Sequence, residues 1–192
     1  MSFDNVLLTG ASGKLGKVIS MRADIQNLWA PSLEVFDLTK LQTIELFFDS
    51  HEIDAVIHCA ALARMSLCEN NPLAAINANI IGTSNLVKAV FKKEKVIKKQ
   101  IRFIHISTDA VYDCTEGSYS EKGPCIPNNK YGWTKLGAEC VVNLLSNFCI
   151  IRTRFFDPDN IPFDESATDL YTSTMPINDL VFSILKVLNT DF

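Results

Sequence analysis

Thr9-Gly10-Ala11-Ser12-Gly13-Lys14-Leu15-Gly16 is the stretch that decides the fold of this 192-residue chain. It joins an apolar run at residues 5–9 to a segment of helical period at residues 14–23. In such a unit the first glycine can take positive φ, the second lets the backbone approach a pyrophosphate, and the third allows helix and strand to pack closely. The helix start also offers free N–H groups and partial positive charge to phosphate. The pattern predicts a dinucleotide-binding turn rather than a purely structural one, with contacts from Gly10, Ser12, Gly13, Lys14, Leu15 and Gly16.

The rest of the chain alternates short apolar runs with longer stretches of helical period, which is typical of βαβ units. The fold class that this predicts is α/β, a Rossmann-type doubly wound parallel sheet with a reduced C-terminal substrate-binding segment. We expect residues 1–154 to form the dinucleotide-binding domain and residues 155–192 to pack on it without forming an independent domain. The expected strands are 5–9, 26–31, 34–36, 54–60, 101–107 and 149–153, and the expected helices are 14–23, 41–51, 72–93, 130–145 and 178–188.

Composition restricts the classes of partner. With 18 basic and 22 acidic residues the net charge is -4, which gives no field to attract nucleic acid or an anionic membrane. No apolar stretch approaches the roughly 20 residues that span a bilayer, and the first residues carry no basic region typical of an export signal. The cysteines follow no metal-binding spacing, so we expect reduced thiols and a cytoplasmic protein without a metal; they are Cys59, Cys68, Cys114, Cys125, Cys140 and Cys149.

Asp37 lies 21 residues after Gly16, near the distance at which a Rossmann unit places an acidic residue. Two interpretations stay open. The carboxylate, with neighbouring Leu38, can face the adenosine part of a dinucleotide, or it can cap a helix that starts at Thr39. After the second strand the chain reads Pro31-Ser32-Leu33-Glu34, without a cation for a 2′-phosphate, although Arg22 could substitute. NAD and NADP are therefore both open as cofactor.

Tyr131 and Lys135 are four residues apart on a predicted helix, so their side chains leave the same face. This helix follows the strand that ends at Thr108, and strand ends and neighbouring helices line the ligand crevice of a parallel sheet. An ammonium about 4 Å from the phenol would favour phenolate by about 4 kcal/mol, lowering the pKa of Tyr131 by roughly three units. Thr108 could hydrogen-bond a substrate carbonyl. We expect Thr108, Tyr131 and Lys135 to be the catalytic residues.

The sequence resembles the extended short-chain dehydrogenase/reductases of the NAD-dependent epimerase/dehydratase superfamily, and among them most closely the dTDP-4-dehydrorhamnose reductase group. The matching stretches occur in the family's order and spacing and cover about 150 residues. They are TGASGKLG at 9–16, FDLT at 36–39, DAVIHCAA at 54–61, ENNPLAAINANIIGTSNL at 69–86, ISTDAVYD at 106–113 and YGWTK at 131–135.

The resemblance implies hydride transfer between a nicotinamide ring and a sugar carbon. In the family the tyrosine exchanges the proton, the lysine also holds the nicotinamide ribose and the threonine polarises the carbonyl, roles that fall on Tyr131, Lys135 and Thr108. The segment Cys59-Ala60-Ala61 resembles the part that passes the cofactor ribose and diphosphate. Asn77 matches the asparagine of the central helix, for which bracing the backbone and taking part in catalysis are equal interpretations.

The same resemblance limits the possible reaction types and suggests an oligomeric state. Dehydratases of the superfamily carry an Asp-Glu pair after the threonine, whereas this chain has Asp109-Ala110, which disfavours dehydration and leaves nucleotide-sugar epimerisation as an alternative to reduction. Only about 40 residues follow Arg152, so a shortened substrate lobe is expected. A non-catalytic NAD(P)-binding regulatory subunit is therefore a further alternative. The resemblance also implies a homodimer through the helices near 75–93 and 132–145.

The three histidines favour structural roles. His58 and His105 fall within predicted buried strands, and His51 lies apart from both. A buried histidine with satisfied hydrogen bonds is more common than a metal ligand or an acid–base catalyst in such a place.

Overall fold

The computed structural model describes residues 3–160 and 172–190. Its centre is a five-stranded sheet in the order β2-β1-β3-β4-β5, and every neighbouring pair is parallel. The strands are β1 (Asn5–Thr9), β2 (Asn27–Trp29), β3 (Ala55–His58), β4 (Arg102–Thr108) and β5 (Phe148–Thr153). Because all strands run in one direction, their carboxyl ends meet at one edge of the sheet, where Rossmann folds bind ligands. The predicted Rossmann-type parallel sheet is confirmed.

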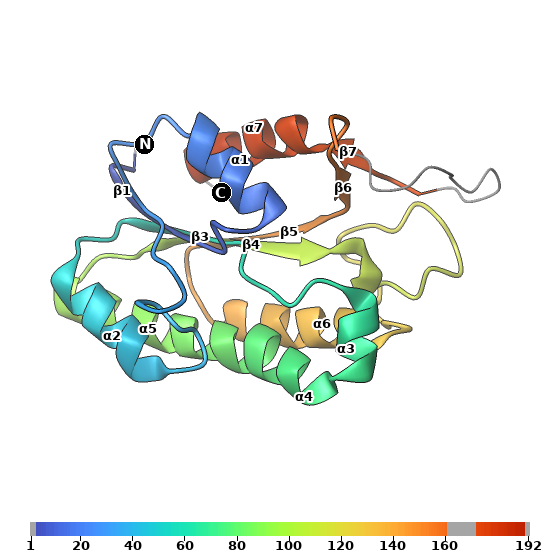
Figure 1. Cartoon of the computed structure of the whole chain (residues 1–192), viewed down its shortest axis with the longest axis horizontal. Helices are drawn as coiled ribbons and strands as arrows, with labels where there is room; N and C mark the ends of the chain where they lie inside the picture. Colours follow the sequence, from blue (N-terminus) through green and yellow to red (C-terminus); the bar gives the residue numbers. More distant parts are fainter. Residues whose placement is uncertain (1–2, 161–171, 191–192) are drawn as a thin grey trace.

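Helices cover both faces of the sheet (Figure 1). One face carries α1 (Lys14–Arg22) and α7 (Ile177–Leu188); the other carries α2 (Leu41–Ser50), α5 (Gly82–Ile97) and α6 (Lys130–Val142). Successive strand residues point to opposite faces, so β1 sends Val6 and Leu8 into the core under α1 and α7, and Leu7 into the core under α2 and α5. Each large apolar side chain buried in this way contributes about 1.5–3 kcal/mol.

Shorter elements complete the chain. They are α3 (Met65–Asn70), α4 (Pro72–Ala75), a π-helix η1 (Ile76–Ile81), a 3-10 helix η2 (Asp109–Val111) and a small parallel pair formed by β6 (Phe155–Phe156) and β7 (Met175–Pro176). Elements α4, η1 and α5 follow one another without a break where one helix at 72–93 was predicted. The wide π turn accommodates one extra residue and re-aims the side chains that follow it.

The strand predicted at 34–36 is wrong. Residues 33–35 form a turn in which the Ser32 carbonyl accepts hydrogen bonds from the amides of Val35 (3.1 Å) and Phe36 (2.9 Å). Only Phe36 is buried, whereas Val35 is exposed, so the apolar run lacks the two-sided burial of a central strand. Helix α5 also continues to Ile97, four residues beyond the prediction, and ends where Lys98 adopts a left-handed conformation (φ 54°).

The start of α6 packs backbone to backbone against η2. A Cβ atom at Gly132 would lie 2.2 Å from the carbonyl oxygen of Ala110 and 2.9 Å from the Pro127 Cβ. No side chain fits there unless the two elements move apart. This contact therefore sets the spacing between the helix that carries Tyr131 and the end of β4 that carries Thr108.

We predict that Gly132→Ala lowers the free energy of unfolding by about 1–3 kcal/mol, because the added methyl group meets backbone that cannot yield without moving a helix. Chemical denaturation followed by circular dichroism measures this. The matched variant is Gly117→Ala, since nothing lies within 4 Å of a Cβ at Gly117, and it should stay within about 0.5 kcal/mol of wild type. Equal stability of the two variants would contradict the proposed tight contact.

Candidate functional site at the carboxyl edge of the sheet

The glycine turn after β1 is built from close backbone contacts. Gly10 has φ +74°, and a Cβ there would lie 2.6 Å from the Ala60 amide nitrogen; a Cβ at Gly16 would lie 2.2 Å from the Gly10 carbonyl oxygen. Gly13 is the N-cap residue of α1, and no side chain caps this helix or adds an acidic group to its first turn. The N–H groups at the helix start are therefore left for an external acceptor, which fits a diphosphate. Leu15 is buried, so only its backbone can take part in such a contact.

Asp37 closes a short turn that precedes α2 (Leu41–Ser50). Its Oδ1 accepts hydrogen bonds from the Thr39 amide (2.9 Å) and the Thr39 hydroxyl (2.7 Å), and Lys40 Nζ lies 3.1 Å from Oδ2. The hydrogen bonds of Thr39, followed by those of Lys40, hold the pKa of Asp37 below its usual range. These contacts do not cap a helix, because Thr39 lies in a turn, α2 begins at Leu41 and its N-cap residue, Lys40, makes no side-chain capping hydrogen bond. The capping interpretation of Asp37 is therefore wrong. Leu38 is half-buried and packs against the core beneath α2 and α5.

The end of β3 contacts the end of β1. The Thr9 hydroxyl accepts a hydrogen bond from the Ala60 amide (3.3 Å), and the Thr9 carbonyl accepts one from the Cys59 amide (3.2 Å). Residues 59 and 60 thus lie directly against the glycine turn. That this segment passes the cofactor ribose and diphosphate stays a prediction. Burial raises the pKa of the Cys59 thiol to about 12, so this thiol is neutral.

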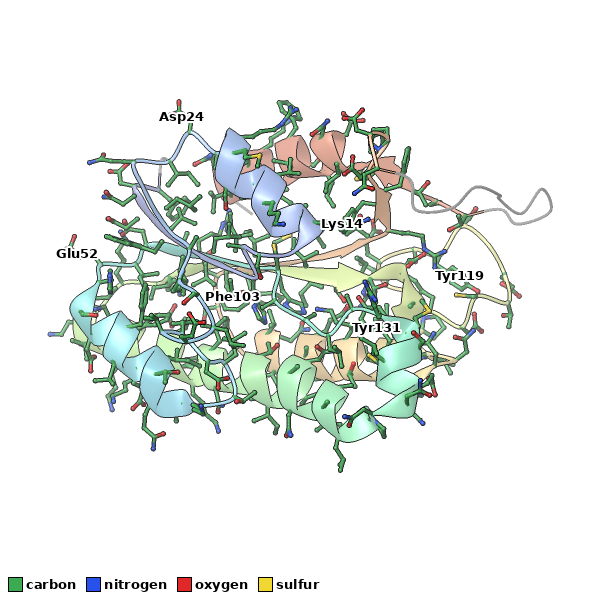
Figure 2. The ribbon with its side chains drawn as sticks, viewed as in Figure 1. Lys14, Asp24, Glu52, Phe103, Tyr119 and Tyr131 are labelled. Atoms are coloured by element: carbon green, nitrogen blue, oxygen red, sulfur yellow. The ribbon has the colours of Figure 1, made fainter. Side chains whose placement is uncertain are left out.

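Thr108 and Tyr131 meet where β4 ends. Thr108 is buried, and its hydroxyl accepts a hydrogen bond from the Ala110 amide and donates one to Asp109, both at 3.2 Å. Burial raises the pKa of Tyr131 to about 12; a hydrogen bond with the Thr108 side chain opposes this, and Cys68 and Asp109 add to it. In Figure 2, Tyr131 lies near the end of the strand arrow and Lys14 lies at the start of α1, on the other side of the sheet.

Lys135 contacts the sheet. Its Nζ donates to the carbonyl oxygen of Ile106 (2.7 Å) and lies 3.2 Å from Nε2 of His105. Burial lowers the pKa of Lys135 to about 8, while Cys59 and Glu139 act in the opposite direction. The expected lowering of the Tyr131 pKa by this lysine is therefore wrong. The amine is bonded to β4, and loss of water around the phenol disfavours phenolate.

His58 and His105 are buried partners on adjacent strands, with ring centroids 5.2 Å apart. His58 is held by two hydroxyl groups, since Nδ1 lies 2.7 Å from Thr9 Oγ1 and Nε2 lies 2.9 Å from Thr83 Oγ1. Burial, with a smaller contribution from Lys135, lowers the pKa of His58 to about 3. The structural interpretation of His58 is confirmed.

The asparagine that braces the backbone is Asn79, two residues beyond the predicted Asn77, which is exposed. Asn79 Oδ1 accepts from the Leu62 amide (2.7 Å), and Nδ2 donates to the Leu62 carbonyl (3.1 Å) and to Thr134 Oγ1 (2.9 Å). Asn79 lies within the π-helix, whose wider turn changes which residues face inward. A sequence alignment on regular helical spacing cannot detect that change.

A buried ion pair near the site was missed from the sequence. Glu139 accepts from Arg152 Nη2 at 2.7 Å and from the Ser107 hydroxyl, and Arg152 Nη1 donates to the Tyr112 hydroxyl at 2.8 Å. The hydrogen bond with Glu139 raises the pKa of Arg152. The available signal was Glu139 itself, an acidic residue one helical turn beyond Lys135 on the inward face of α6.

Residues 3–160 and 172–190 contain no group of three or more histidine, cysteine or acidic side chains placed to hold a metal ion. All six cysteines are free thiols. Within the part of the chain that the structure describes, no helix is both long and apolar enough to cross a membrane.

The parallel sheet, the glycine turn at its carboxyl edge and the flanking helices define a Rossmann-like protein of the NAD-dependent epimerase/dehydratase superfamily. Within that class the match is more specific. The model of the family described as "RmlD substrate binding domain" matches residues 4–157, and the chain belongs to this family.

Three similar proteins place the chain among its relatives. It is 31% identical over 147 residues to methionine adenosyltransferase 2 subunit beta of Pongo abelii, covering 71% of this chain and 42% of that protein. It is 33% identical over 155 residues to dTDP-4-keto-6-deoxy-D-glucose reductase of Streptomyces niveus, covering 78% and 52%. The structure of dTDP-4-dehydrorhamnose reductase from Bacillus anthracis in complex with NADP shares the fold, with a TM-score of 0.84, 24% identity and coverage of 99% and 72%. The chain spans about half the length of the curated relatives it matches.

The two buried histidines predict a loss of stability in acid. The folded-state pKa values of both lie below the ordinary 6.5, so between about pH 6.5 and about pH 4 the unfolded state binds more protons. The free energy of unfolding should therefore fall with decreasing pH, by up to about 1.4 kcal/mol per pH unit for each histidine. Urea denaturation across this range measures the slope.

The variant His58→Gln removes one of these titrating groups and should reduce the contribution of the histidines to the slope by about half. Carboxylates contribute equally to both proteins, so the difference between the two slopes isolates His58. Identical slopes would show that His58 is not held neutral in the folded state.

Proposed function

We propose that this protein is an NAD(P)-dependent oxidoreductase that acts on the carbonyl or hydroxyl group of a nucleotide sugar. The observation that carries the proposal is the placement of the glycine turn and of Thr108, Tyr131 and Lys135 at the same edge of one parallel sheet. The similarity to a dTDP-4-keto-6-deoxy-D-glucose reductase supports this class of substrate.

The cofactor would bind with its diphosphate at the start of α1. Backbone N–H groups of the turn would donate to the phosphates, and exposed Ser12 and Lys14 would add polar and positive groups at the same place. Residues 59–61 would pass the ribose and diphosphate, and Leu38 would contact the adenosine, while the Asp37 carboxylate is largely occupied by Thr39 and Lys40. When bound, the reduced nicotinamide supplies the hydride.

The site favours reduction of a carbonyl group. Because the pKa of Tyr131 is about 12, the phenol is protonated at neutral pH and can donate its proton to the oxygen of a carbonyl that accepts a hydride. The Thr108 hydroxyl can donate to the same oxygen when its O–H turns from Asp109 toward the substrate. Lys135, with a pKa of about 8, is mainly protonated at pH 7 and would donate to the ribose hydroxyl groups of the dinucleotide.

A second candidate is a dinucleotide-binding subunit without its own catalysis. It is favoured by the 31% identity to a protein named as subunit beta of methionine adenosyltransferase 2. In that case the turn would bind a dinucleotide for structural reasons, and the chain would act through a larger partner. The two candidates differ in whether the bound dinucleotide is oxidised.

We predict that Tyr131→Phe lowers kcat for reduction of a 4-keto nucleotide sugar by at least about 100-fold, because the proton donor is lost. The consumption of NADH or NADPH measures kcat, and chromatography of the product separates reduction from epimerisation. The dissociation constant of the dinucleotide should stay within about threefold of wild type, because the diphosphate site is untouched.

Each result of this comparison has one meaning. A variant as active as wild type would contradict the role of Tyr131. Tight dinucleotide binding without turnover of any tested nucleotide sugar would favour the subunit. Failure of both dinucleotides to bind would contradict both candidates.

We also propose a cytoplasmic homodimer. The six free thiols suit a reducing compartment. Large apolar side chains are exposed on α4, η1 and α6 and in the turn after α6; they are Leu73, Ile76, Ile81, Trp133 and Leu144. Element η1 contacts α4, α5 and α6, and these elements lie on one side of the sheet (Figure 1). Such a patch is unfavourable in water and is typical of an interface.

We predict that Trp133→Glu weakens this dimer by at least about tenfold in its dissociation constant, since Trp133 is 53% exposed in the single chain and would be covered in the pair. Sedimentation velocity at several concentrations measures this. The control is Leu46→Glu, which changes an exposed leucine on α2 and should leave the equilibrium unchanged. A wild-type protein that is monomeric at all concentrations would disprove the dimer.

A further inference from the structure

The amine of Lys135 contacts two neutral hydrogen-bond acceptors on strand β4. Nζ lies 2.7 Å from the Ile106 carbonyl oxygen and 3.2 Å from Nε2 of His105. Lys135 is 2% exposed and His105 is fully buried. The position of the amine is therefore fixed by β4 and not by water.

The His105 ring directs its hydrogen bonding at this amine. The other ring nitrogen, Nδ1, is buried and has no hydrogen-bond partner among the described residues. His58, the neighbouring imidazole on β3, differs in this respect, because both of its nitrogens contact threonine hydroxyl groups. The contact with Lys135 is thus the one polar interaction found for the His105 side chain in the described part of the chain.

Among the groups of the described residues that face Lys135, none is a carboxylate that is free to pair with its ammonium group. From β3, His58 and the Cys59 thiol are both neutral. From α6, Glu139 is already paired with Arg152, at 2.7 Å. Tyr131, one turn before Lys135 on the same helix, is neutral as well. Cys59 and Glu139 favour the charged form of Lys135 without bonding to its amine. The hydrogen-bond partners found for Nζ among the described residues are the two acceptors on β4, of which only His105 is a side chain.

We propose that His105 is a positioning residue that anchors the Lys135 amine to the sheet and keeps it protonated for contact with the dinucleotide. The inference rests on the proposed function, in which Lys135 binds the ribose. An ammonium group has three N–H bonds. Two are directed to Ile106 and His105, so the third is left for a hydroxyl group of the cofactor. A neutral imidazole supports the charge without binding it as firmly as a carboxylate would.

The expected direction follows from the charge state. Accepting a hydrogen bond from an ammonium stabilises the protonated form, so removing the acceptor should lower the pKa of Lys135 further from its present value of about 8. At pH 7 a larger fraction of the amine would then be neutral. Binding of the dinucleotide would weaken at a lower pH than in wild type.

The test is an NMR titration of the full chain labelled with ¹³C at lysine Cε, in wild type, His105→Leu and His105→Gln, with Lys135→Arg used to assign the signal. The Leu variant should shift the Lys135 midpoint downward by about one pH unit or more. The Gln variant, whose amide oxygen can accept near the position of Nε2, should return it to within about 0.5 unit of wild type. The dissociation constant of NADPH, measured between about pH 6 and about pH 9, should follow the same midpoints.

One control variant and one substitute variant make the outcome decisive. His58→Leu removes the neighbouring buried imidazole, which does not contact Lys135 Nζ, and should leave the midpoint within about 0.5 unit. If His105→Leu fails to fold, His105→Asn replaces it, because the shorter amide does not reach Nζ. An unchanged midpoint in the Leu or Asn variant would overturn the inference. Because the titration needs no turnover, a shifted midpoint in a protein without reductase activity would disprove the proposed function and leave the anchoring by His105 supported.

Discussion

The structure depends on the close approach of three backbone segments at one end of the sheet. A Cβ at Gly10 would collide with the backbone of residues 59–60, and a Cβ at Gly16 would collide with the backbone of Gly10 and Ala11. This close packing fixes where α1 starts relative to the ends of β1 and β3, and it exposes uncapped N–H groups at the carboxyl edge. A second contact of the same kind, between Gly132 and Ala110, fixes α6 on the other side. The distance between the turn and the Tyr131 helix is thus set by backbone packing, which is more rigid than side-chain packing.

A polar core lies behind this edge. Histidine, lysine, glutamate and arginine side chains are buried next to strand ends that are otherwise apolar. Burying them is costly unless each finds partners. Hydroxyl groups satisfy His58, Arg152 satisfies Glu139, and a backbone carbonyl takes one N–H of Lys135. The result is a site in which burial shifts the pKa values of His58, Lys135 and Tyr131 away from their ordinary values.

The sequence predicted those features that depend on local pattern. The glycine spacing, the two-sided burial of β3 and β4, and the order of Thr108, Tyr131 and Lys135 all appear where they were expected. The predictions that were wrong concern features that depend on tertiary contacts rather than on local sequence pattern. Residues 34–36 form part of a turn in which only Phe36 is buried, and in the π-helix it is Asn79 rather than Asn77 that braces the backbone. The spacing of Tyr131 and Lys135 predicted a shared face, but it could not reveal that Lys135 bonds to β4 or that burial raises the pKa of Tyr131. The division of the chain at residue 154 stays a prediction.

The wide turn of η1 determines how the helical segments on its two sides face relative to each other. A π turn holds one residue more than a regular turn, so it is equivalent to an insertion that the helix absorbs without breaking. If the same residues were wound as a regular α-helix, the extra residue would rotate everything on one side of residues 76–81 by about 100° relative to the other. Asn79 could then no longer join Leu62 to Thr134 while α5 kept its apolar face on the sheet. The irregular winding reconciles two facing requirements that a uniform helix of this length cannot meet together.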